Sequence, residues 1–284
     1  MTRNPGPLVR PAREPDAGGA IQRITPQDAG WTWTAFDAHR LHAGDRVERP
    51  GDGREVLVLV LEGTASVTVG GVALGAVGTR ASVFEEPPAG VVLCAPGEGV
   101  GVVAAGDVLL AIATAPAGDV RRTAVIEPGT IRVETRGEGP ARRTIKNLLP
   151  PDAEAGRLIA VEAYTPGGNW SSYPPHKHDT ENPPVEARLE EFYFYRFAKP
   201  QGFGFQRVYT ADRSLDEAMA VTDCDVVLVP EGYHPFGAPA GYDAYYLNIM
   251  AGPNRAWYFT IDPDHAWLMN WNPAAPRAQE EPPA

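Results

Sequence analysis

The segment YPPHKHDTENPPVEARLEEFYFYRF, residues 173–197, holds two histidines one residue apart, an acidic stretch broken by prolines, and a glutamate that opens an aromatic run. Side chains at positions i and i+2 of an extended strand point the same way. His176 and His178 are therefore expected to share a face, with Lys177 turned away. Such histidines can be solvent-exposed strand residues or the first half of a metal site, and the rest of the sequence decides between the two.

The aromatic run that closes the segment has the composition of a β-strand. Its alternation places Glu191, Tyr193 and Tyr195 on one face and directs Glu190 to the other. We therefore expect Glu191, rather than Glu190, to face the same space as the two histidines.

A third histidine follows a second apolar run. In DVVLVPEGYHP, residues 225–235, an apolar strand leads into a Pro-x-Gly turn with His234 just after it. Three imidazole nitrogens and one carboxylate oxygen suit a divalent transition metal. The sequence thus predicts a metal site formed by His176, His178, Glu191 and His234.

Short β-type runs punctuated by Gly, Pro and Asp recur along the whole chain, which predicts an all-β fold with antiparallel strands in a sandwich or barrel. Residues 54–71 are expected to form two strands joined by a turn at residues 62–64. Residues 127–150 are charged and glycine-containing, as a connector is, and 213–221 is a candidate for a short helix. Two β-rich halves around a connector predict two tandem barrels of similar type.

The predicted organisation has four parts. Both ends are rich in Pro, Ala and charge and lack apolar periodicity, which is typical of flexible tails. The parts are a flexible N-terminal tail at 1–18, an N-terminal barrel at 19–140, a C-terminal barrel at 141–272, and a flexible C-terminal tail at 273–284.

The charge and composition exclude several classes of partner. A formal net charge of −11 over 284 residues disfavours a broad nucleic-acid contact, although a small anion can still bind at locally placed arginines. No run approaches the roughly 18 apolar residues of a membrane span, and the N-terminus lacks the apolar region of a secretory signal. Two cysteines, Cys94 and Cys224, suit a reducing compartment, so we expect a cytoplasmic protein.

The order H-x-H, glutamate, distant histidine within an all-β chain resembles the cupin superfamily. The likeness departs from the common pattern in two places: the spacer between His178 and Glu191 is long, and one residue rather than two separates Gly232 from His234. The N-terminal half has the strands but no H-x-H, and its His39 and His42 lack a carboxylate at suitable spacing. We therefore expect the N-terminal barrel to be a degenerate cupin without metal.

The C-terminal half resembles the 5-deoxy-glucuronate isomerase family of myo-inositol degradation, which is related to the 5-keto-4-deoxyuronate isomerases. The likeness rests on several motifs in order: PPHKHD, LEEFYFYRF, PQGFGFQRVYT, RSLDEAMAV, DVVLVPEGYHP, GYDAYYLNIMAGP and DPDHAWL. It implies a two-cupin fold and the conversion of 5-deoxy-D-glucuronate to 5-dehydro-2-deoxy-D-gluconate. It also implies that His176, His178, Glu191 and His234 bind a divalent ion, with zinc, manganese and iron all compatible.

An aldose–ketose isomerisation moves a proton between adjacent carbons through an enediolate, which requires a general base. Tyr193 and Tyr195 share the expected ligand face, although a tyrosine is a poor base unless its pKa is lowered. Glu190 is the nearest additional carboxylate, but its phase points it elsewhere. A metal-bound hydroxide is a further alternative, and the sequence does not choose among them.

The carboxylate of a sugar-acid substrate calls for a guanidinium, which can bind it through two parallel hydrogen bonds. Arg207 and Arg196 are the candidates. Only one of Gln206 and Arg207 is expected inside the barrel, because adjacent strand residues face opposite ways. Tyr246 is a further candidate for substrate contact, with core packing as its alternative role.

Two rival hypotheses remain at this level. The same ligand set holds iron in cupin dioxygenases, which predicts oxygen dependence. A non-enzymatic cupin that binds a sugar acid is the other, although no helix-turn-helix output element is evident. A homo-oligomer is expected in each case, because duplicated cupins with wide apolar sheet faces commonly associate.

Overall fold

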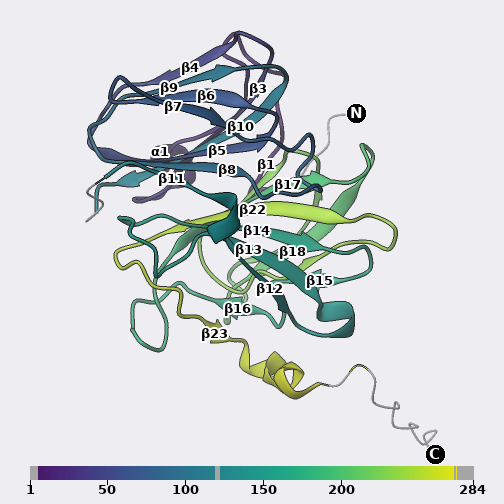
Figure 1. Ribbon diagram of the computed structural model, residues 1–284. Helices are drawn as coiled ribbons and strands as arrows, with labels where there is room; N and C mark the ends of the chain where they lie inside the picture. The colour runs from purple at the N-terminus through teal and green to yellow at the C-terminus, as the bar shows by residue number, and fades with distance from the viewer. Residues whose placement is uncertain (1–5, 119–121, 272, 274–284) are drawn as a thin grey trace, which may run out of the picture.

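The computed structural model describes residues 6–118, 122–271 and 273. Its strands form two all-β halves that lie one above the other in Figure 1, with the N-terminal half at the top. The predicted all-β class is confirmed. No helix in the described part of the chain is long and apolar enough to cross a membrane.

The N-terminal half contains two antiparallel sheets. The six-stranded sheet has the order β11-β8-β5-β10-β3-β2 and the four-stranded sheet the order β4-β9-β6-β7. The strands are β2 (Ala20–Ile24), β3 (Ala35–Leu41), β4 (Arg46–Arg49), β5 (Arg54–Glu62), β6 (Ala65–Val69), β7 (Val72–Val77), β8 (Gly90–Cys94), β9 (Val100–Ala104), β10 (Val108–Pro116) and β11 (Ala124–Ile126). Helix α1 (Pro26–Ala29) is capped by Thr25.

The C-terminal half is built on a seven-stranded sheet of order β1-β20-β17-β22-β14-β13-β12, faced by a four-stranded sheet of order β15-β21-β18-β19 and a two-stranded sheet β16-β23. The strands are β1 (Val9–Arg10), β12 (Arg132–Arg136), β13 (Arg143–Leu149), β14 (Ile159–Thr165), β15 (Trp170–Ser171), β16 (His176–Lys177), β17 (Glu190–Phe197), β18 (Phe203–Tyr209), β19 (Asp216–Thr222), β20 (Val226–Val229), β21 (Phe236–Gly237), β22 (Ala244–Ala251) and β23 (Thr260–Ile261). Short 3-10 turns are η1 (Pro128–Thr130), η2 (Gly139–Ala141) and η3 (Pro263–Asn270).

The turn at residues 62–64 is confirmed as the link between β5 and β6. Gly63 is needed there, because its φ of +82° is left-handed and a Cβ would lie 2.2 Å from the carbonyl oxygen of Asp107.

The expectations of a short helix and of a connector are wrong. Residues 213–221 contain most of strand β19, whose residues pair with those of β18, rather than a helix. The presumed connector at 127–150 contributes β12 and β13 to the C-terminal sheet, so the change between halves precedes residue 132 rather than falling at 140.

The predicted N-terminal tail lies partly outside the described residues, and its described part holds β1. This strand pairs with β20, and its Val9 is buried, so the segment is part of the C-terminal sheet instead of a free tail. The predicted C-terminal tail lies outside the described residues except for Pro273.

The two halves share a hydrophobic core. The larger sheets pack face to face, and Phe36 of β3 lies 4.5 Å from Phe192 and 5.6 Å from Phe194 of β17, measured between ring centroids. Across the same junction Arg80 forms a buried ion pair with Glu162. Strand β17 therefore buries its even-numbered aromatic residues between the halves and its odd-numbered ones inside the C-terminal half.

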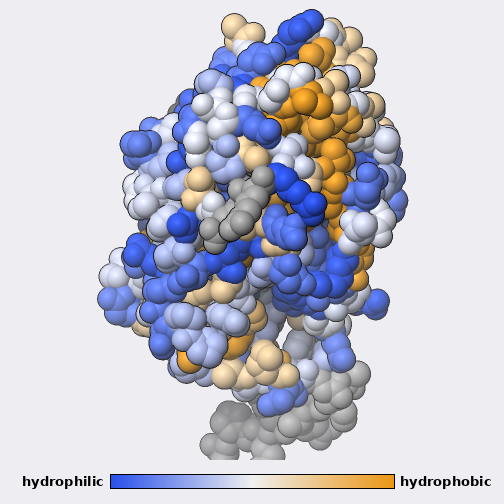
Figure 2. Space-filling model, turned by 60° about the vertical axis from the view of Figure 1, so that its left-hand side comes forward, coloured by the Kyte–Doolittle hydropathy of each residue, from blue (hydrophilic) through white to orange (hydrophobic). Residues whose placement is uncertain are grey.

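In the view of Figure 2 hydrophobic residues form a band over the upper, N-terminal part of the surface, above a mainly hydrophilic lower part. Val72 on strand β7 is among the exposed apolar side chains, with 63% of its surface accessible. Exposed apolar patches are typical of protein contact surfaces.

Candidate metal centre

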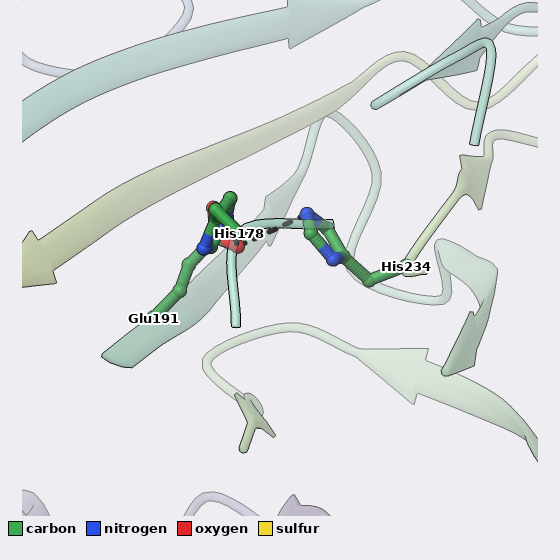
Figure 3. Close-up of side chains that lie close together, drawn as sticks. All are labelled: His178, Glu191 and His234. Atoms are coloured by element: carbon green, nitrogen blue, oxygen red, sulfur yellow. Dashed lines mark hydrogen bonds and ion pairs between the residues drawn. The ribbon is translucent and has the colours of Figure 1, made fainter. Parts of the chain in front are cut away.

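Three side chains from separate segments meet inside the C-terminal half. His178 follows β16, Glu191 lies on β17, and His234 lies in the loop between β20 and β21; their ligand atoms all fall within 4.8 Å of one another (Figure 3). Nε2 of His178 is 2.8 Å and Nε2 of His234 is 3.0 Å from the same oxygen, Oε2 of Glu191. All three residues are buried. The described part of the chain contains no other such group of three or more residues.

Backbone carbonyls fix which imidazole nitrogen faces this cluster. Nδ1 of His234 lies 2.9 Å from the carbonyl oxygen of Gly232, and Nδ1 of His178 lies 3.3 Å from that of Leu189. A carbonyl only accepts, so each Nδ1 carries a proton, and in the neutral ring each Nε2 keeps a lone pair directed at Glu191. This is the tautomer that metal-binding histidines adopt when their other nitrogen donates to a carbonyl.

The donor set fits a metal ion. Nε2 of His234 has no hydrogen-bond partner although it is fully buried, and the atom nearest to it in the cluster is a carboxylate oxygen. Two acceptors 3.0 Å apart in a dry interior repel each other unless a proton or a cation lies between them. The other oxygen of Glu191 accepts a hydrogen bond of 2.5 Å from Nδ2 of Asn248, which holds the carboxylate in place.

His176 stands beside the cluster. Its ring centroid lies 5.0 Å from that of His234, and its Nδ1 is 3.1 Å from the carbonyl oxygen of Pro174, so its Nε2 is also free as an acceptor. It is not one of the three residues whose ligand atoms already lie together. Its role as a fourth ligand stays a prediction.

Electrostatics favour the metal-binding protonation states. Burial acts to raise the pKa of the Glu191 carboxyl, but His234 and His178 outweigh burial and bring this pKa down to about 2. Burial lowers the pKa of His176 to about 3, with repulsion from the other two histidines adding to it. Burial likewise lowers the pKa of His234. Burial also acts to lower the pKa of His178, but the neighbouring Glu191 carboxylate outweighs burial and raises it. Near neutral pH the centre therefore offers one carboxylate and the neutral imidazoles of His176 and His234.

The cluster opens into a cavity of about 970 Å³. The metal end is lined by His176, Glu191, Tyr193, Tyr246 and Asn248. The cavity continues to Arg136 and Arg143 on β12 and β13, and its wall also includes Trp257, Phe259, Leu268, Met269 and Trp271. The 3-10 turn η3 near the C-terminus thus contributes Leu268 and Met269 to the wall of this cavity.

Two of the predicted tyrosines face this cavity. The hydroxyl of Tyr193 lies 2.9 Å from Oγ of Ser172, and that of Tyr246 lies 2.5 Å from Oγ of Ser171. Burial raises the pKa of both phenols, so both are neutral near pH 7 and can donate or accept hydrogen bonds. Neither has the lowered pKa that a general base requires.

Tyr195 and Gln206 lie deeper in the barrel. The Tyr195 hydroxyl donates to Oε1 of Gln206 over 2.8 Å, and Nε2 of Gln206 donates to the carbonyl oxygen of His234 over 3.3 Å. Neither residue lines the cavity. They support the backbone that carries His234 rather than contacting a ligand.

Glu190 was a candidate base, and the structure places it at the junction between the halves instead. Its carboxylate accepts hydrogen bonds of 2.6 to 2.9 Å from the backbone N–H groups of Thr32, Trp33 and Thr34. The cause is the strand phase: Glu190 shares the face of Phe192, which looks toward the N-terminal half. Glu190 is therefore not available for proton transfer in the cavity.

The two arginines proposed for the substrate carboxylate are also elsewhere. Arg196 bridges Glu62 of the N-terminal half and Asp223, at 2.8 Å each, on the face of β17 turned away from the cavity. Arg207 lies on the exposed face of β18 and donates two hydrogen bonds of 2.7 Å to Asp216 of β19. As strand alternation requires, Gln206 points inward and Arg207 outward.

The sequence interpretation missed Arg136 and Arg143, which line the cavity. Both lie in RGEGPARR, residues 136–143, within the stretch taken for a connector. The available signal was a glycine-rich turn with an arginine on each side, which is typical of a hairpin whose two flanking residues face each other.

Comparisons with known proteins agree with the geometry. The profile of the KduI/IolB family matches residues 8–268. The chain belongs to the KduI/IolB family. A relative from Geobacillus kaustophilus (strain HTA426), named 5-deoxy-glucuronate isomerase, is 41% identical over 273 residues, which cover 96% of this chain and 99% of the relative. A relative of the same name from Listeria monocytogenes serovar 1/2a is 43% identical over 266 residues, covering 92% and 97%. The resemblance stated from the sequence motifs is confirmed.

Solved structures show the same relationship. The crystal structure of an IolB-like protein from Salmonella typhimurium LT2 superposes with a TM-score of 0.90 at 44% identity, covering 93% of this chain and all of that one. An oxalate decarboxylase from Lactobacillus farciminis, solved as a formate complex, matches with a TM-score of 0.64 at 11% identity, covering 95% and 92%. This second likeness concerns the fold alone and supports the all-β architecture.

Proposed function

We propose that this KduI/IolB family member is a metal-dependent aldose–ketose isomerase that converts 5-deoxy-D-glucuronate to 5-dehydro-2-deoxy-D-gluconate in myo-inositol degradation. The observation that carries the proposal is the buried His178–Glu191–His234 cluster at the end of a cavity large enough for a six-carbon sugar acid. The name shared by relatives that are 40–45% identical over most of the chain supports the substrate.

His178, Glu191 and His234 would hold the metal, with His176 as a fourth ligand. A divalent ion at this place supplies Lewis-acid polarisation of a substrate carbonyl and stabilises negative charge on oxygen. Zinc, manganese and iron all accept the set. Asn248 fixes the orientation of Glu191 through its 2.5 Å hydrogen bond, and the buried walls exclude water from the ligand nitrogens.

Tyr193 is the residue of the chain best placed to hydrogen-bond a sugar oxygen near the cluster. Its hydroxyl is buried, neutral and already paired with Ser172, so the phenol can donate to an enediolate oxygen while Ser172 returns a hydrogen bond. Tyr246, paired with Ser171, offers a second such hydroxyl on the neighbouring strand. We assign both tyrosines to substrate orientation and charge stabilisation, not to the abstraction of the proton.

At the level of the fold, we propose two tandem cupin-type barrels of which only the C-terminal one keeps its ligands. The likeness to an oxalate decarboxylase over 95% of the chain supports two such units, and the aliphatic filling of the N-terminal interior supports its degeneracy. We also propose a cytoplasmic homo-oligomer, for which the apolar band in Figure 2 offers a contact surface.

The test is anaerobic turnover of 5-deoxy-D-glucuronate by the metal-loaded protein, beside the variants His178→Ala and His42→Ala. We expect isomerisation without oxygen, abolished in His178→Ala and retained in His42→Ala, whose histidine is exposed on the N-terminal half and paired with Asp107. Turnover only in the presence of oxygen would indicate a dioxygenase instead. Binding without turnover in either condition would indicate a sugar-acid-binding protein.

A further inference from the structure

Two arginines stand side by side on the wall of the cavity. Arg136 of β12 and Arg143 of β13 are directly opposite each other in the antiparallel register and both line the cavity. Like charges at directly opposed positions destabilise a strand pair. An anion that binds between the two groups would relieve this repulsion.

The two guanidinium groups are not equivalent. Arg136 donates to Oε1 of Glu134 over 2.7 Å and packs over the ring of Trp257 at 4.9 Å, so its charge is already balanced. Arg143 is partly buried, and within the described residues it has no carboxylate at ion-pair distance. Its Nη1 donates to the backbone carbonyl of Ala141 over 3.1 Å, which orients the group without bringing a carboxylate to it.

The surroundings of Arg143 are consistent with a receptor for a negative group. Burial lowers the pKa of Arg143, since water no longer stabilises its charge fully, although a guanidinium stays protonated at any physiological pH. The turn between β12 and β13 leaves space for the Arg143 side chain only because residue 137 is a glycine. Gly137 has a φ of +72°, and a Cβ there would lie 2.9 Å from Nη1 of Arg143 and 2.3 Å from the carbonyl oxygen of Ala141.

The guanidinium of Arg143 reaches toward the metal end of the cavity. The register places Thr144 opposite Tyr164, Tyr164 opposite Tyr245 and Tyr245 opposite Arg196, so the backbone of Arg143 is level with Phe197, six residues along β17 from Glu191. Its long side chain covers part of this distance, because Tyr246 and Tyr193, which line the metal end, are among the groups that act on its pKa. An extended six-carbon chain adds about 6 Å from first to last carbon, given C–C bonds of about 1.5 Å.

We propose that Arg143 binds the carboxylate of the sugar-acid substrate, with Arg136 as an auxiliary donor, and thereby directs the carbonyl end toward the His178–Glu191–His234 cluster. This inference rests on the proposed function for the identity of the substrate. It replaces Arg207 and Arg196, which are engaged with Asp216, Asp223 and Glu62 outside the cavity. It assigns Arg143 the role of a specificity determinant for acids over neutral sugars.

The experiment compares wild type, Arg143→Met, Arg143→Lys and the matched control Arg207→Met, all metal-loaded and checked for metal content and melting temperature. Turnover is measured with 5-deoxy-D-glucuronate and with its neutral analogue, in which the carboxylate is reduced to an alcohol. Binding of D-glucuronate and of D-glucose is measured by calorimetry in parallel, so that recognition of the acid is followed independently of catalysis.

We expect Arg143→Met to lower kcat/KM for the acid about 30- to 100-fold, mainly through KM, while kcat/KM for the neutral analogue changes by less than about threefold. Arg143→Lys keeps the charge but loses the two parallel hydrogen bonds, so its kcat/KM for the acid should lie between those of wild type and Arg143→Met. This variant also tests the proposal if Arg143→Met does not fold. Arg207→Met should behave as wild type. Metal content should be unchanged in all four proteins.

The inference is overturned if wild type and Arg143→Met prefer the acid over the neutral analogue to the same extent. It is also overturned if wild type does not bind D-glucuronate, or if Arg143→Met binds it as tightly as wild type does. Unchanged binding of D-glucuronate in Arg143→Met is the result expected if the substrate carboxylate binds the metal instead of Arg143. Failure of the proposed function is separate: Arg143-dependent binding of D-glucuronate without turnover of 5-deoxy-D-glucuronate would reject the substrate assignment and leave the carboxylate site standing.

Discussion

The interiors of the two halves are filled in different ways although both are antiparallel two-sheet structures. The N-terminal interior is a cluster of Val, Leu, Ala, Ile and Cys side chains in which Val58, Val92 and Leu110 are fully buried. The C-terminal interior contains tyrosines on β17 and β22 together with buried His178 and Glu191, and it leaves a cavity of about 970 Å³. Similar backbones thus carry either a packed core or a site, and the inward-facing residues decide which.

The largest expected difference is between substitutions at two adjacent residues of β17, one facing the metal centre and one facing the N-terminal half. Glu191→Gln removes the carboxylate between the two histidines, and we expect loss of bound metal and a fall in turnover of at least about 1,000-fold. Glu190→Gln, one residue earlier, should keep the metal and most of the turnover. Metal analysis and single-substrate kinetics on both variants check this. Equal losses in the two variants would contradict the assignment of the faces of β17.

The purely structural role of the N-terminal interior predicts a large effect on stability and none on chemistry. Leu110→Ala should lower the free energy of unfolding by about 2–5 kcal/mol, because it leaves a cavity in a tightly packed aliphatic cluster. Metal content and KM should be unchanged at a temperature where the variant is folded. Urea unfolding and metal analysis measure the two quantities. Loss of metal on this substitution would show that the halves do not divide their roles in this way.

Glu190 is expected to contribute to the stability of the junction between the two halves. Its carboxylate holds three backbone N–H groups of residues 32–34, and Glu190→Gln keeps the size of the side chain but removes the charge from these hydrogen bonds. We expect a loss of about 1–3 kcal/mol in unfolding free energy. Thermal unfolding beside Glu190→Asp is the measurement. A stability equal to wild type would mean that the junction between the halves does not depend on this contact.

The smallest effect is expected for Arg207. Its ion pair with Asp216 is exposed, with 43% of the arginine side chain accessible, so Arg207→Leu should cost less than about 1 kcal/mol and leave activity intact. Its neighbour Gln206 is buried and supports the backbone of His234, so Gln206→Leu should weaken metal binding. Metal affinity of the two variants tests this contrast. A loss of activity in Arg207→Leu alone would restore the arginine as a substrate contact.

Sequence reasoning succeeded where strand periodicity alone determines the outcome. The alternation in EEFYFYRF separates Glu191, Tyr193 and Tyr195 from Glu190 and Phe192, and the structure has the same separation. The meeting of His178, Glu191 and His234 could be expected because three motifs had the order of a metal site.

The failures have a common physical origin in tertiary context. Periodicity states which residues share a face, but not what lies opposite that face. Arg196 and Arg207 were therefore credible carboxylate ligands until Asp223 and Asp216 were found beside them. Arg143 was overlooked because charged residues and glycines around it resemble a connector, although β12 and β13 pair with each other and join the C-terminal sheet.

The central claim is that one metal ion, held in the C-terminal half, supports the function of the whole chain. Its most direct test is the metal content of the purified, metal-loaded protein per chain, measured by mass spectrometry of the elements, in wild type and His234→Ala. The account predicts one divalent ion per chain in wild type and none in the variant. A second ion per chain, or an ion retained by His234→Ala, would contradict it.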